Sequence, residues 1–169
     1  TLIDTAPDFV VCVNQLRRHF GKNALADDII SQQVSNGARI LTLLAMDLLP
    51  ENGIDEKNLT SLCDSSEFAD NKARLLEHYH NIAGEHAAMY PGMPELLESL
   101  KANAISWGIV TNKPELYTTP VILGLNLQPP AGTVICPDHV KEKKPHPEAL
   151  FLACSELGSA PERTVYIGD

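Results

Sequence analysis

The sequence predicts an α/β protein with a parallel β-sheet, joined to a separate all-helical module. Two observations lead to this fold class. In the second half of the chain, short runs of β-branched and apolar residues alternate with stretches of helical periodicity. In the first half the periodicity is helical, with almost no strand signal. A series in which strands and helices alternate implies right-handed crossovers and a parallel sheet covered by helices on both faces.

Three apolar runs are expected to form the strands of this sheet: residues 105–110, 133–136 and 164–167. Helical spacing predicts helices over residues 115–123 and 147–157, between these strands. Pro114 suits the start of the first of these helices, and Gly158 can end the second. A further helix, over residues 95–100, is expected ahead of the first strand.

The helical module is expected in the first half because apolar residues recur there at helical spacing. Its clearest amphipathic patterns lie in residues 9–20, 38–49 and 68–83. The run Tyr-Pro-Gly-Met-Pro at residues 90–94 marks the return to the α/β part. The predicted segments are therefore residues 1–8 as the start of the α/β core, 9–88 as the helical module and 89–169 as the remainder of the core.

Composition and charge argue against several classes of function. The 13 Lys and Arg residues against 22 Asp and Glu residues give a formal charge of −9, which a nucleic acid or an anionic membrane would repel. No apolar stretch reaches the roughly 20 residues that span a bilayer. The four cysteines are widely spaced without a C-x-x-C pair, which fits a reducing cytoplasm and, for Cys136, a buried thiol. We expect a small-molecule partner, and the sequence leaves the oligomeric state open.

Polar residues follow each predicted strand, where ligands of open parallel sheets bind. Thr111 and Asn112 follow the first strand, and Lys144 lies in the loop after the second, at the start of a Lys-Pro-His-Pro run. Gly168 and Asp169 follow the third strand. A hydroxyl, an amide, a lysine and a carboxylate at one edge suit a phosphate beside Mg²⁺. The sequence therefore predicts that Thr111, Asn112 and Lys144 bind phosphate and that Asp169 binds the metal.

Each of these residues also has a purely structural interpretation. Thr111 and Asn112 could close a strand and cap a helix. Lys144 is one of several lysines in a charged loop, and its Pro-x-Pro context favours it over its neighbour Lys143. Asp169 could be an ordinary loop carboxylate. In the helical module, Arg39 beside the Ser-Asn-Gly turn could bind a substrate carboxylate through two hydrogen bonds, or could be a surface residue.

These residues together resemble the haloacid dehalogenase superfamily of phosphatases. The resemblance rests on Thr111-Asn112, on Lys144-Pro145-His146-Pro147 and on Val165-Tyr166-Ile167-Gly168-Asp169, which look like the second, third and fourth motifs of that family. Residues 1–5 look like the chain that follows the first motif, D-x-D-G-T-L-x-D-T. The family implies a Rossmann-like core with the helical module as an inserted cap, and the resemblance covers essentially the whole chain.

Within the family the sequence is most similar to phosphoglycolate phosphatases. Three further segments, at residues 34–39, 92–97 and 135–140, resemble the N-acetylmuramic acid 6-phosphate phosphatases of peptidoglycan recycling. This finer resemblance implies that Asn36, Gly37 and Arg39 of the cap select the substrate. It also implies a small, acidic phosphate ester as that substrate.

The family implies phosphoryl transfer in two steps, through an aspartyl-phosphate. Thr111 and Lys144 would act as catalytic residues by contacting the transferring phosphoryl group, and Asp169 would help to hold Mg²⁺. The nucleophilic aspartate and the acid–base aspartate of the first motif would precede Thr1. We therefore expect residues 1–169 to be a part of the enzyme that is inactive and marginally stable by itself, and whose sheet lacks its central strand.

Three alternatives remain open at this point. The fold could serve a hexose-phosphate mutase or a dehalogenase, although a dehalogenase needs no metal and Gly168-Asp169 speaks mildly against it. It could also be a non-catalytic binding module derived from a phosphatase. The residues that precede Thr1 discriminate among these alternatives, because a phosphatase requires D-x-D-G there and a dehalogenase a single Asp.

Overall fold

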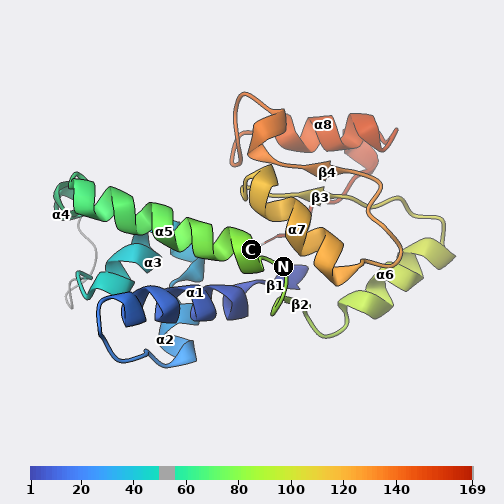
Figure 1. Cartoon of the computed structure of the whole chain (residues 1–169). Coiled ribbons are helices and arrows are strands. Elements are labelled where there is room, and N and C mark those ends of the chain that lie inside the picture. Colours follow the sequence, from blue (N-terminus) through green and yellow to red (C-terminus); the bar gives the residue numbers. More distant parts are fainter. Residues whose placement is uncertain (50–55, 169) are drawn as a thin grey trace. The chain divides into compact units, whose positions relative to one another are not determined.

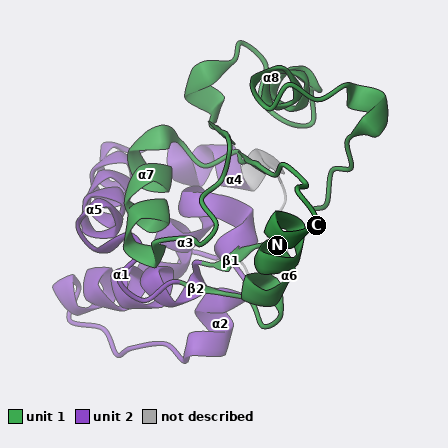
Figure 2. Cartoon of the chain, turned by 90° about the vertical axis from the view of Figure 1, so that its right-hand side faces the viewer, with its two compact units in different colours: residues 1–4, 88–169 green, residues 5–87 purple. Residues whose placement is uncertain are grey.

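The protein, described by a computed structural model over residues 1–49 and 56–168, divides into two compact units. Unit 1 consists of residues 1–4 and 88–169, and unit 2 of residues 5–87 (Figures 1 and 2). Unit 1 is α/β and unit 2 is helical. No helix in the described residues is both long and apolar enough to cross a membrane.

Unit 2 is built from helices α1 (Ala6–His19), α2 (Asp27–Ser31), α3 (Gly37–Met46), α4 (Glu56–Cys63) and α5 (Ser66–Ile82). The helical periodicity of the sequence is thereby confirmed, while the two short helices, α2 and α4, were not predicted. Helix α1 packs against α2, α3 and α5. One cluster of its core consists of Ile40, Leu43, Leu59 and Phe68, all nearly inaccessible to solvent.

The first turn of α5 shows how the sequence sets a boundary in this unit. Ser65 precedes the helix in an extended conformation, and its Oγ accepts a hydrogen bond of 3.1 Å from the N–H of Phe68. A serine in this position satisfies one of the N–H groups that a helix leaves unpaired at its start. Further along α5, the ring of Tyr79 stacks on Phe9 of α1 at a centroid distance of 4.1 Å.

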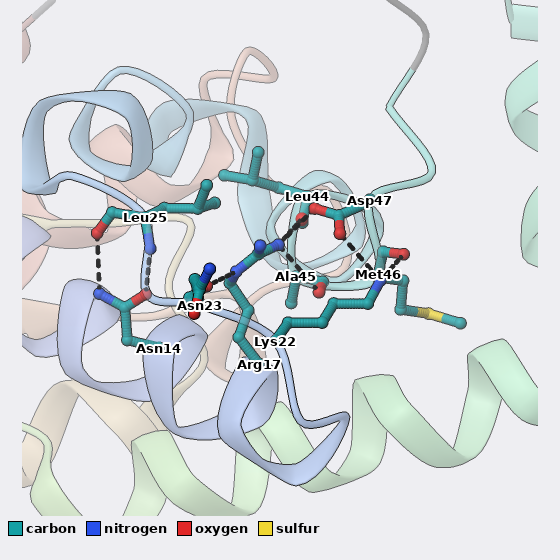
Figure 3. Close-up of polar contacts among 9 residues, drawn as sticks. All are labelled: Asn14, Arg17, Lys22, Asn23, Leu25, Leu44, Ala45, Met46 and Asp47. Carbon is teal, nitrogen blue, oxygen red and sulfur yellow. Dashed lines mark hydrogen bonds and ion pairs between the residues drawn. The ribbon is translucent and has the colours of Figure 1, made fainter.

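A buried arginine ties α1 to the end of α3 in unit 2 (Figure 3). The guanidinium of Arg17 donates to the carbonyl oxygens of Asn23, Leu44 and Ala45 and pairs with the carboxylate of Asp47. Lys22 also pairs with Asp47, at 3.0 Å. The last carbonyl groups of a helix lack partners within the helix, so Arg17 satisfies two of them at the end of α3.

Replacing Arg17 with methionine is expected to destabilise the protein by about 2 kcal/mol, because buried carbonyl oxygens lose a charged donor. The hydrogen bonds from Arg17 and Lys22 lower the pKa of Asp47, so the substitution should raise this pKa toward its usual value. In the wild type this stabilisation is present above the unfolded pKa of Asp and is lost as the pH falls through the lowered folded pKa. Urea unfolding measures the loss of stability, and an NMR titration measures the pKa of Asp47. The same substitution at the exposed Arg74 is the control. An unchanged Asp47 titration would contradict this account.

In its described residues, unit 1 contains two separate pairs of short strands. β1 (Ile3–Asp4) pairs with β2 (Ala88–Met89) in antiparallel orientation, and β3 (Ile109–Val110) pairs with β4 (Val134–Ile135) in parallel. Its helices are α6 (Met93–Ala102), α7 (Glu115–Leu125) and α8 (Glu148–Glu156), accompanied by the 3₁₀ turns η2 (Pro137–His139) and η3 (Pro161–Arg163). The order β3, α7, β4, α8 confirms the predicted alternation and the parallel pairing.

The core of unit 1 lies where α8 packs on β3 and β4. Ile135, Ala149 and Ala153 are buried there against the partly buried Val110. The segments before the two strands approach so closely that a Cβ atom on Gly108 would lie 2.6 Å from the side chain of Thr133. Gly108 is therefore required by packing. Gly158 ends α8 with a φ of +63°, as its place in the sequence predicted.

Two strand predictions require correction. The first predicted strand, residues 105–110, is regular only over Ile109–Val110. The third, residues 164–167, is wrong, because in the described chain this segment belongs to no sheet and its Val165 and Ile167 side chains are 82% and 71% exposed. An apolar, β-branched run forms a strand only where a neighbouring strand pairs with its backbone, and propensity reports nothing about that neighbour.

Candidate active site

The carboxyl end of β3 positions the first two candidate residues. The ladder with β4 continues one residue past β3, since the N–H of Thr111 donates to the carbonyl oxygen of Ile135 at 3.0 Å. The Oγ1 of Thr111 accepts the N–H of Lys113, also at 3.0 Å, which turns the chain toward α7. In this geometry the hydroxyl acts as an acceptor, so its own O–H proton can be donated to an oxygen of a ligand.

Lys144 reaches the same place from the loop that precedes α8. Its ammonium nitrogen lies 2.8 Å from the carbonyl oxygen of Val110, the last residue of β3, and 2.9 Å from the hydroxyl of Tyr166. The amide of Asn112 donates to the carbonyl oxygen of Lys144 at 3.0 Å. An ammonium group has three protons, so after these two contacts one N–H can still be donated to an anion. The structure therefore brings Thr111, Asn112 and Lys144 together.

A second loop, after β4, is connected to the same region. The carboxylate of Asp138 accepts the N–H of Glu115 at 2.8 Å and so caps α7 from outside that helix. His139 Nε2 lies 3.4 Å from a carboxylate oxygen of Glu115. Cys136 is buried, and this burial is the main cause that raises the pKa of its thiol. The expectation of a buried thiol at this strand end is confirmed.

The three candidate specificity residues lie together in unit 2, at the start of α3. Asn36 ends a 3₁₀ turn, and its amide donates to the side chain of Gln33 at 2.9 Å. Gly37 opens α3 with a φ of +81°, a conformation that favours glycine. Arg39 stands in the first turn of α3. All three residues are exposed, and their part in substrate selection stays a prediction.

Asp169, the predicted metal ligand, lies outside the described residues. Within residues 1–49 and 56–168, no group of three or more His, Cys, Asp or Glu side chains could hold a metal ion. The structure therefore shows where Thr111, Asn112 and Lys144 lie, while their binding of phosphate and the binding of the metal by Asp169 stay predictions.

Two residues near Lys144 were not identified from the sequence. Tyr166 was assigned to a strand, yet its hydroxyl bonds the Lys144 ammonium and its ring centroid lies 5.2 Å from that ammonium. Glu148 accepts hydrogen bonds from two backbone N–H groups of the lysine loop. Neither role has a sequence signal, because both depend on how the chain folds back on itself.

The profile of the haloacid dehalogenase-like hydrolase family matches residues 1–169. The chain is 36% identical to the N-acetylmuramic acid 6-phosphate phosphatase of Pseudomonas aeruginosa, covering 100% of the chain and 69% of that protein. It is 33% identical to the phosphoglycolate phosphatase of Colwellia psychrerythraea, covering 100% of the chain and 72% of that protein.

Two solved structures share the fold at lower identity. A hydrolase of haloacid dehalogenase subfamily IA from Geobacter sulfurreducens matches with a TM-score of 0.71 at 17% identity, over 99% of the chain and 73% of that structure. CbbY from Rhodobacter sphaeroides, solved in complex with phosphate, matches with a TM-score of 0.61 at 21% identity, over 98% of the chain and 72% of that structure.

The chain therefore belongs to the haloacid dehalogenase-like hydrolase family. Its α/β unit is a partial Rossmann-like core of that family, as the parallel strands β3 and β4 and the similar structures show. The two relatives at 33% and 36% identity are phosphatases, which places the chain among the phosphoric monoester hydrolases of the family. The resemblance drawn from the sequence is thereby confirmed.

Proposed function

We propose that this chain supplies the phosphate-binding residues of a Mg²⁺-dependent phosphatase that acts through an aspartyl-phosphate. The observation that supports the proposal is the position of the Lys144 ammonium, which lies 2.8 Å from the carbonyl oxygen of Val110, the residue that precedes Thr111. A cation and a hydroxyl donor at the carboxyl end of a parallel strand suit an anionic ligand.

In the proposed reaction, an aspartate that precedes Thr1 attacks phosphorus and the bond to the ester oxygen breaks. A second aspartate gives its proton to the leaving alcohol, and water then hydrolyses the aspartyl-phosphate. Thr111 donates its hydroxyl proton to an oxygen of the transferring phosphoryl group, and Lys144 neutralises the negative charge on these oxygens. Proteins accelerate phosphoryl transfer mainly by holding donors and cations in fixed positions, where they stabilise the negative charge of the transition state.

Mg²⁺ is the cofactor of this proposal, with Asp169 as one of its ligands. Magnesium prefers carboxylate and phosphate oxygens, and it would add positive charge next to that of Lys144. Support comes from the resemblance of Gly168-Asp169 to the fourth family motif and from family membership.

For the substrate we propose a small acidic phosphate ester, either 2-phosphoglycolate or N-acetylmuramic acid 6-phosphate. The relatives at 33–36% identity bear these two substrates in their names. In this proposal unit 2 is the cap, and Arg39 binds the substrate carboxylate, with Asn36 and Gly37 shaping the turn beside it. The second substrate would place the enzyme in peptidoglycan recycling, in the cytoplasm.

A substrate panel tests this proposal with the protein in its full natural length. We expect phosphate release from one of these two esters, dependent on Mg²⁺ and abolished by a chelator. Arg39→Gln should raise KM about 10-fold or more for the preferred ester, since an ion pair to the substrate carboxylate is lost, and should change KM little for a phosphate ester without a carboxylate. Arg74→Gln, an exposed arginine of α5, is the matched control.

Three results would decide against the proposal. Halide release from a haloacid, without phosphate release from the esters, would indicate a dehalogenase. Transfer of phosphate within a hexose phosphate would indicate a mutase. Binding of the esters without turnover would indicate a binding module.

A further inference from the structure

The loop that carries Lys144 is closed by a carboxylate of the following helix. Glu148 is the first residue of α8, and its two carboxylate oxygens accept the backbone N–H groups of Lys141 and Glu142, each at 3.0 Å. These bonds join positions 141 and 148, so the segment between them forms a closed loop with Lys144 near its middle. The hydrogen bond from Asn112 to the Lys144 carbonyl holds the loop from the other side.

The two hydrogen bonds to Glu148 help to determine which lysine of the 141–148 loop points toward β3. The loop contains Lys141, Lys143 and Lys144, of which the first two are exposed and only Lys144 is partly buried with its ammonium on the Val110 carbonyl. If the loop backbone shifted by one residue, the Lys144 side chain would point away from β3. Because a free loop samples many backbone conformations, two hydrogen bonds to one carboxylate restrict it strongly.

The charge of Glu148 fits this role. The N–H groups of Lys141 and Glu142 are the first causes that lower the pKa of its carboxyl group. The carboxylate therefore stays ionised at neutral pH, where it accepts hydrogen bonds at both oxygens.

We propose that Glu148 is the positioning residue of the phosphate site, which closes the 141–148 loop so that the Lys144 ammonium lies at the end of β3. This inference rests on the proposed function, because it gives Glu148 its effect on catalysis through Lys144. Glu148 itself touches neither the substrate nor the reacting atoms.

Glu148→Ala in the full-length protein is expected to lower kcat/KM about 10- to 100-fold, by analogy with the loss seen when a partner that orients a metal-binding side chain is removed. Glu148→Gln should lower kcat/KM less, since the amide oxygen of glutamine can still accept one of the two N–H groups. The control is Glu142→Ala, which removes the same charge from the same loop and keeps the backbone N–H that Glu148 binds.

A double-mutant cycle separates positioning from a general effect on folding. If Glu148 acts through Lys144, then Glu148→Ala should reduce activity in the wild type and have little further effect in the Lys144→Met protein. An equal loss in both backgrounds would overturn the proposal, as would a loss with Glu142→Ala as large as that with Glu148→Ala.

An NMR measurement tests the inference independently of activity. In the wild type we expect nuclear Overhauser contacts between the Lys144 side chain and the Tyr166 ring, and we expect Glu148→Ala to abolish them. If the wild type shows these contacts but no phosphatase activity, the proposed function fails and the positioning of Lys144 stands. If Glu148→Ala leaves the contacts unchanged, the positioning role itself is refuted.

Discussion

Replacing Lys144 with methionine is expected to lower kcat/KM of the full-length enzyme by about 100- to 1000-fold. Methionine keeps much of the length of the side chain and removes its charge. The ammonium that lies at the end of β3 would then no longer stabilise the negative charge of the transferring phosphoryl group. Removing one fixed donor to a developing anion typically has an effect of this size.

The measurement compares Lys144→Met with Lys143→Met, the neighbouring exposed lysine. Lys143→Met should retain nearly full activity, because its side chain faces solvent. Similar losses in the two variants would show that general loop charge matters rather than the position of Lys144. A Lys144→Met enzyme of normal activity would remove the main support for the phosphatase site.

Replacing Asp8 with alanine is expected to destabilise the protein by about 3 kcal/mol. The carboxylate of Asp8 is fully buried in α1 and accepts the backbone N–H groups of Gly84 and His86, each at 2.8 Å. Hydrogen bonds to charged groups contribute about 1.5 to 3 kcal/mol each, and alanine would leave both N–H groups without this acceptor. Asp8→Asn should destabilise the protein less, because the single amide oxygen of asparagine can still accept one of the two N–H groups.

Urea unfolding checks this expectation through the midpoint and slope of the transition. Asp70→Ala, at an exposed position of α5, is the control and should shift the midpoint little. An Asp8→Ala midpoint close to that of the wild type would mean that water replaces the lost carboxylate. The same pair of hydrogen bonds ties the chain after α5 to the start of α1, two segments that lie 76 residues apart.

The helices were the part of the fold that could be predicted from the sequence. Predicted helices over 115–123 and 147–157 correspond to Glu115–Leu125 and Glu148–Glu156. Their periodicity and their end signals, such as Gly158, are local and can be read from a few neighbouring residues. The short helices α2 and α4 were missed, since helices of five and eight residues carry too little periodicity.

The strands were predicted less well, for a physical reason. Residues 164–167 have the composition of a strand but join no sheet in the described chain, and residues 105–110 are regular over only two positions. The hydrogen bonds of a helix form within its own segment, whereas those of a strand require another segment. No property of residues 164–167 alone reveals whether that other segment is present.

The sequence by itself determined the family, the α/β class and the types of side chain in the candidate site. The reason is that motif residues such as Thr111 and Lys144 have recognisable neighbours along the chain. Only the tertiary structure decided that Lys144 lies on the Val110 carbonyl, that Tyr166 accompanies it and that Glu148 closes its loop. These contacts join residues 6 to 34 positions apart, so they depend on the path of the backbone rather than on local preference.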